Sequence, residues 1–132
     1  MTAAVARRTV GVRLAEDLNA AADLLEREGW VRECLHSPTS GHDVTGAIYA
    51  ATGYHRRDED GRWVAHPLEH SAGRRATDCI TWLVRNLPAG SVWEFNDRHC
   101  LNQDAAVDAL RRAADAAVRQ LSTPRDAERL LS

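Results

Sequence analysis

The sequence predicts a mainly α-helical fold, a four- to five-helix bundle with one or two short extended segments. Apolar residues recur at three- and four-residue intervals along several stretches, which places them on one face of a helix. Residues that cap helices stand before several of these stretches, and Gly or Pro follows three of them. The 132 residues fit one domain, residues 1–132, which can bury enough surface to need no disulfide or metal.

The first predicted helix follows a weakly ordered lead-in, residues 1–12, whose Val10–Val12 could form a short strand. Gly29 ends this helix where a left-handed residue is common, so Trp30 should fold back onto the core as a lid. The residues expected on its buried face are Leu14, Leu18, Ala21, Ala22 and Leu25.

A shorter second helix is predicted between its cap, Asp43, and its stop, Gly53. Turn-forming residues predict loops on both sides of it, over residues 31–41 and 55–65. In the second loop Trp63 should pack its own loop down, although it could also lie exposed.

The third predicted helix runs from about Arg74 to the residue before Pro88, because the residue before a proline disfavours helix. Its inner face should include Cys79, and Trp82 should lie in or near the core. Val92–Cys100 then reads as an extended segment that could form a small hairpin with Trp63–Val64.

Asn102 is the expected N-cap of the fourth helix, and Thr123-Pro124 should begin a short terminal helix over residues 123–132. The residues expected on the buried side of the fourth helix are Val107, Leu110, Ala114, Ala117, Val118 and Leu121.

Composition narrows the classes of function. A net charge of −2 argues against a protein that mainly grips nucleic acid, which would carry a basic stripe. No apolar run has the length of a signal peptide or a membrane span. Three cysteines without CxxC spacing argue against a disulfide scaffold. We therefore expect a soluble cytoplasmic protein.

Several short stretches together resemble a family of small uncharacterised proteins from actinobacteria and their phages. The stretches are Ala21–Trp30, Gly46-Ala-Ile48, Phe95-Asn-Asp97 and the Ala/Leu/Arg-rich helix that follows. The resemblance spans roughly Leu14 to Val118. It implies a bacterial cytoplasmic setting and a helical fold, and it assigns no residue a catalytic role.

His66-Pro-Leu-Glu-His70 matches the H-x-x-E-H pattern of inverted zinc proteases. That chemistry needs both imidazoles on one helical face. Pro67 pushes His66 out of helical geometry, so a chance match is the preferred interpretation.

A second metal hypothesis rests on Cys34, His36 and His42, to which His99-Cys100 could add ligands. Zinc needs three or four such groups that converge on one point. The spacing does not force convergence, so the preferred interpretation is loop residues without a metal, and we expect no cofactor.

The best polar cluster is Asn96, Asp97 and His99, next to Trp93. Asp97 could orient His99 as a general base, or the four residues could line a ligand pocket. The simpler interpretation is that Asn96 and Asp97 form turn hydrogen bonds.

These observations favour a small binding, regulatory or accessory protein that acts through protein contact, with self-association or a protein partner expected. A small enzyme or ligand binder around Asn96, Asp97 and His99 is the first alternative. A Cys/His metal-binding protein is the second.

Overall fold

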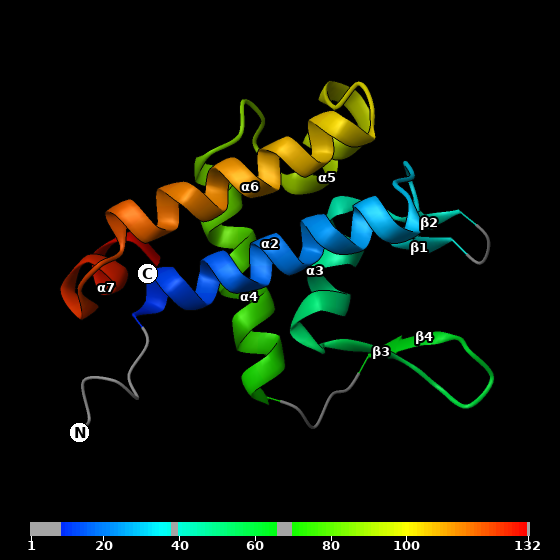
Figure 1. Ribbon diagram of the computed structural model, residues 1–132, viewed down its shortest axis with the longest axis horizontal. Coiled ribbons are helices and arrows are strands. Elements are labelled where there is room, and N and C mark those ends of the chain that lie inside the picture. The colour runs from blue at the N-terminus through cyan, green and yellow to red at the C-terminus, as the bar shows by residue number, and fades with distance from the viewer. Residues whose placement is uncertain (1–8, 38–39, 66–69, 132) are drawn as a thin grey trace.

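The computed structural model describes residues 9–37, 40–65 and 70–131 and confirms the mainly α-helical fold. Two long helices, α2 (Val10–Glu28) and α6 (Gln103–Gln120), lie side by side and run in opposite directions, and α4 (His70–Arg85) crosses them (Figure 1). The other helices are α3 (Val44–Thr52), α5 (Val92–Glu94), the π-helical turn η1 (Phe95–His99) and α7 (Pro124–Leu131). The strands are β1 (His36–Ser37), β2 (Gly41–His42), β3 (His55–Arg57) and β4 (Trp63–Ala65).

Helix α2 begins earlier than its apolar pattern indicates. The Thr9 side chain accepts a hydrogen bond from the Val12 N–H at 3.1 Å, so Val10–Val12 form the first helical turn. The prediction of an extended segment there is wrong; the rest of the predicted lead-in, residues 1–8, lies outside the described residues. Gly11 in this first turn lies against α6, because a Cβ at this position would lie 2.3 Å from the Ala117 carbonyl oxygen. Only a glycine lets α2 approach the backbone of α6 so closely.

The core lies between α2, α3, α4 and α6. The predicted inner face of α2 is confirmed throughout, and Trp82 is 2% exposed with its Nε1 donating to the Ala113 carbonyl at 2.8 Å. Buried Asp17 on α2 accepts two hydrogen bonds from Arg75 on α4, at 2.5 and 3.1 Å. The buried side of α6 is largely as predicted, except that Val118 is 49% exposed. A helix has 3.6 residues per turn, so each step of four residues turns slightly further around its axis. The row that begins at Leu110 and continues through Ala114 therefore faces solvent by Val118.

The caps of α3 and α6 are confirmed. Asp43 Oδ1 accepts from the Gly46 N–H at 2.6 Å, Gly53 adopts the left-handed conformation after α3, and Asn102 Oδ1 accepts from the Ala105 N–H at 2.9 Å. The two predicted loops each contain a small antiparallel hairpin, β1–β2 and β3–β4. Since β4 pairs with β3, the predicted hairpin between Trp63–Val64 and residues 92–95 is wrong.

Residues 92–99 are helical, so the prediction of an extended segment is wrong for them. Ser91 Oγ caps α5 by accepting from the Glu94 N–H at 3.2 Å, and the Cys100 N–H closes the π-helical turn on the Phe95 carbonyl at 2.7 Å. Val92, Phe95 and Asn96 are buried, at spacings of three and four residues, as on one face of a helix. Trp93 therefore points away from Phe95 and is 54% exposed.

Candidate functional site

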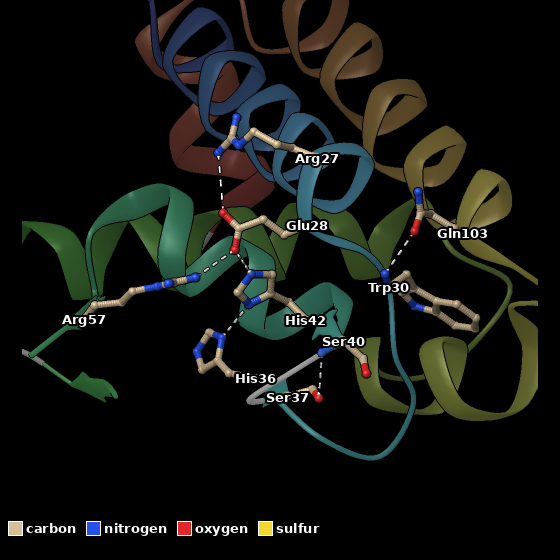
Figure 2. Close-up of polar contacts among 9 residues, drawn as sticks. All are labelled: Arg27, Glu28, Trp30, His36, Ser37, Ser40, His42, Arg57 and Gln103. Atoms are coloured by element: carbon tan, nitrogen blue, oxygen red, sulfur yellow. Dashed lines mark hydrogen bonds and ion pairs between the residues drawn. The ribbon is translucent and has the colours of Figure 1, made fainter. Parts of the chain in front are cut away.

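A chain of three histidines joins the two hairpins to the end of α2; we call it the histidine chain. His36 Nδ1 lies 2.7 Å from His42 Nδ1, and the opposite nitrogen of the same ring, Nε2, lies 2.8 Å from His55 Nδ1. His42 Nε2 lies 3.0 Å from Glu28 Oε1, at the end of α2. Figure 2 shows Glu28, His42 and His36 in line beneath α2. Three rings from three strands therefore form one hydrogen-bonded series that ends on a carboxylate.

Aromatic and charged side chains surround the histidine chain. Trp63 stacks on His36 with ring centroids 4.6 Å apart, and the Arg57 guanidinium lies over Trp63 at 4.9 Å. Arg57 also donates to Glu28 Oε1 at 3.0 Å. On the other side, the His55 ring lies 4.6 Å from Tyr49 and stacks on Tyr54 at 5.3 Å. Trp63 thus packs against the other hairpin as well as against its own loop.

This environment favours neutral imidazoles. Burial lowers the pKa of His36 to about 4, with further lowering from the neighbouring His42, His55 and Arg57. Burial also lowers the pKa of His55. Burial alone would raise the pKa of Glu28, but the hydrogen bond and charge of His42 and the charges of Arg57 and Arg27 together lower it. At neutral pH the series consists of uncharged His36 and His55 rings and an ionised Glu28.

The structure brings His36 and His42 together but does not converge them with Cys34 on one point. The Cys34 thiol donates to the His36 carbonyl at 3.0 Å, and His36 presents opposite ring nitrogens to His42 and His55. A single ion cannot contact both of these nitrogens. Within the described part of the chain, no group of three His, Cys, Asp or Glu side chains could hold a metal ion. Most of the H-x-x-E-H pattern, residues 66–69, lies outside the described residues.

A second polar cluster centres on Asn96, whose side chain is fully buried. Its Oδ1 accepts from Trp30 Nε1 at 2.6 Å and from the Val44 N–H at 3.0 Å. Its Nδ2 donates to the Val31 carbonyl at 3.1 Å and to Asp97 Oδ1 at 2.8 Å. All four hydrogen-bonding positions of the amide are therefore used, which is the complete set an Asn side chain can offer.

Asp97 extends this cluster, because its Oδ1 also accepts from the Glu33 N–H at 2.9 Å. Nearby, the pKa of Asp43, the cap of α3, is raised to about 6, mainly by burial. The hydrogen bond from the Gly46 N–H lowers this pKa in part, and the charge of Asp97 raises it further. Asn96 and Asp97 thus hold the loop after α2 and the start of α3 to η1.

The four residues predicted around a ligand pocket lie on two sides of one segment. Asn96 and Asp97 bond to the loop after α2, whereas Trp93 and His99 are exposed. His99 Nε2 faces Glu94 Oε1 at 3.7 Å, and the Arg98 guanidinium lies 5.3 Å from the centre of the Trp93 ring. The structure therefore pairs His99 with Glu94 and pairs Asp97 with Asn96.

Sequence reasoning missed Glu28 and His55 as members of the histidine chain. No local signal marks them, because intervals of six and thirteen residues between the three histidines match neither a helix nor a strand period. Trp93 was singled out, but within a segment that was predicted to be extended and is helical. Only the helical spacing of Val92, Phe95 and Asn96 could have corrected this.

The fold and the two clusters define a small, mainly α-helical domain in which buried polar side chains attach loops and hairpins to the helices. Residues 9–116 match DUF6197, a family of unknown function, and the chain belongs to this family. No curated protein and no solved structure matches the chain. Within the described residues, no helix is both long and apolar enough to cross a membrane.

Proposed function

We propose that this protein is a small cytoplasmic binding or accessory protein, from an actinobacterium or one of its phages, that acts through protein contact. We place the contact on the outer surface of residues 92–101, defined by Trp93, Arg98 and Leu101. The observation that carries this proposal is that Trp93 and Leu101, 54% and 82% exposed, flank a π-helical turn fixed to the core.

Rigid anchoring of this segment supports the proposal. The inner side of this segment is buried in the core through Val92, Phe95 and Asn96. The backbone that carries Trp93 is therefore held in place. A preorganised aromatic side chain loses little entropy on binding, and Trp and Arg are the residues that most often dominate protein interfaces. π-helical turns are rare and frequently occur at functional sites.

The cytoplasmic placement rests on the thiols. Cys34, Cys79 and Cys100 are all free, and Cys34 is exposed. An exposed free thiol fits a reducing compartment better than an oxidising one. The alternative of an enzyme or ligand site around Asn96, Asp97 and His99 is supported less well, because Asn96 has no hydrogen-bonding capacity left for a ligand.

Replacing Trp93 with Ala should weaken binding of the partner at least tenfold, because truncating a central aromatic residue typically costs about 2 kcal/mol or more. The measurement has two parts: sedimentation velocity of the purified protein for self-association, and capture from host lysate on immobilised wild type and Trp93→Ala. Leu101→Ser should act in the same direction.

Val118→Ser is the matched control, since Val118 is also an exposed aliphatic side chain. It lies near the other end of α6, roughly 25 Å from Leu101 by the helical rise. We expect Val118→Ser to bind like the wild type. A wild type that sediments as a monomer and retains no protein that Trp93→Ala loses would overturn the proposal.

A further inference from the structure

We propose that the histidine chain is a one-proton switch: it holds the β3–β4 hairpin against the β1–β2 hairpin with at most one excess proton, and one of its links between histidines opens when a second arrives. The regulating ligand is the proton. This inference stands apart from the proposed protein contact, because it rests on different residues and predicts a change in the hairpins.

The hydrogen bonds of the histidine chain fix the position of each ring proton. Ionised Glu28 can only accept, so His42 must donate from Nε2, which leaves His42 Nδ1 as an acceptor. His36 must then donate from Nδ1 and accept at Nε2. His55 must in turn donate from Nδ1. With all three rings neutral, this is the one arrangement that satisfies every bond in the series.

The same count limits how many protons can be added. The three hydrogen bonds each hold one hydrogen, and the remaining ring position is His55 Nε2, so one excess proton fits there without breaking a bond. A second proton on any ring places two N–H groups face to face, either between His36 and His42 or between His36 and His55. One of the links between strands must then open.

The hairpins depend on these links. Strands β1 and β2 have two residues each, and β3 and β4 have three. Isolated two-stranded hairpins are marginally stable at best, so they depend on contacts outside their own pairing. Backbone hydrogen bonds of His42 with Gly29 and Val31 hold β2 to the segment after α2, and the Arg57–Glu28 ion pair holds β3 to α2. The contacts between the described residues of the two hairpins include the His36–His55 bond and the packing of Trp63 on His36 and against His42.

The charged and titratable groups around the series set the direction of the switch. Two arginines offset the charge of Glu28 on α2: Arg27 Nη2 lies 3.9 Å from Glu28 Oε2, and Arg57 Nη2 lies 3.0 Å from Glu28 Oε1. Tyr49 on α3 and Tyr54, which follows it, contact His55. Among the described residues, Glu28 is the one acidic side chain bonded to the three rings. A doubly protonated series therefore has one carboxylate against two imidazolium charges and Arg57.

The links between the histidines weaken as the pH falls. The pKa of His36, about 4 in the attached state, lies below its ordinary value of 6.5. Between these two values the attached state binds fewer protons than the detached state, so the attached state loses stability as the pH falls through this window. Above it the hairpins remain attached.

The test is a pH titration of the full-length, ¹⁵N-labelled protein by NMR, from about pH 7.5 to about pH 4, across the range in which histidines titrate. At the upper end we expect Nε2–H on His42 and Nδ1–H on His36 and His55. On acidification, the amide signals of β1–β4 should shift together with the ring signals while those of the core of α2 and α6 stay in place.

Variants sharpen the test. His36→Gln should shift the hairpin signals already at the upper pH, and His55→Gln should shift the signals of β3–β4 while those of β1–β2 stay in place. His99→Gln, which removes an exposed histidine outside the series, should titrate like the wild type. Independent titration of the three rings near their ordinary pKa without a hairpin shift would overturn the proposal, as would stoichiometric binding of added zinc to all three rings.

Discussion

Replacing Asn96 with Ala should lower the free energy of unfolding by about 3–5 kcal/mol. The change leaves the Trp30 indole N–H, the Val44 N–H and the Val31 carbonyl without the partner that each has now. Each buried polar group left without a partner costs about 1–3 kcal/mol. Urea unfolding followed by circular dichroism measures this loss.

Asn102→Ala provides the comparison. Asn102 also accepts a backbone hydrogen bond, from the Ala105 N–H, but this bond is exposed and caps only α6. Loss of such a cap costs about 1 kcal/mol. If Asn96→Ala were no more destabilising than Asn102→Ala, the buried cluster would not hold the loop after α2 to η1.

Replacing Gly46 with Ala should destabilise the protein by about 3 kcal/mol, which is at the upper end for overpacking. Gly46 is helical, but a Cβ there would lie 1.8 Å from the Leu35 carbonyl oxygen and 2.7 Å from its carbon. Backbone atoms cannot move aside like a flexible side chain. The loop at Leu35 must therefore shift, which breaks the 3.2 Å hydrogen bond from the Asp43 N–H and displaces neighbouring His36.

Gly73→Ala is the matched control, with an effect of opposite sign. Gly73 lies in α4, and its added Cβ would meet a Tyr54 ring carbon at 3.5 Å, an ordinary contact. Ala is preferred over Gly inside a helix by about 0.5–1 kcal/mol, so this variant should be slightly more stable than the wild type. Equal melting temperatures for the two variants would show that the approach of Leu35 does not constrain residue 46.

The elements with local signals could be predicted from the sequence. Asp43 and Asn102 cap helices because a short side-chain oxygen can reach the free N–H groups of a first turn. Gly53 stops α3 because it adopts a left-handed conformation that other residues rarely accept. The regular apolar spacing of α2 likewise identified its buried face.

Residues 92–100 were misread for a physical reason. The buried face of this segment includes Asn96, and a polar residue in a pattern of apolar spacing normally indicates solvent. Without Asn96, the alternation of apolar Trp93 and Phe95 with polar Glu94 resembles a strand. The burial of Asn96 depends on partners more than fifty residues away, at Val31 and Val44, which no local pattern contains.

The histidine chain depends on tertiary proximity in the same way. Strands of two and three residues are too short to show an alternating pattern, so the hairpins that carry His36, His42 and His55 had no signature. The sequence identified His36 and His42 as neighbours in one loop. It could not show that the next loop folds back to add His55.

The central claim is that residues 92–101 have an inner side that carries stability and an outer side that is free for binding. Urea unfolding of Trp93→Ala tests it most directly. Because Trp93 is 54% exposed, we expect its loss to lower the free energy of unfolding by less than about 1 kcal/mol. A loss as large as that of Asn96→Ala would contradict the claim, since Trp93 would then be part of the structural core.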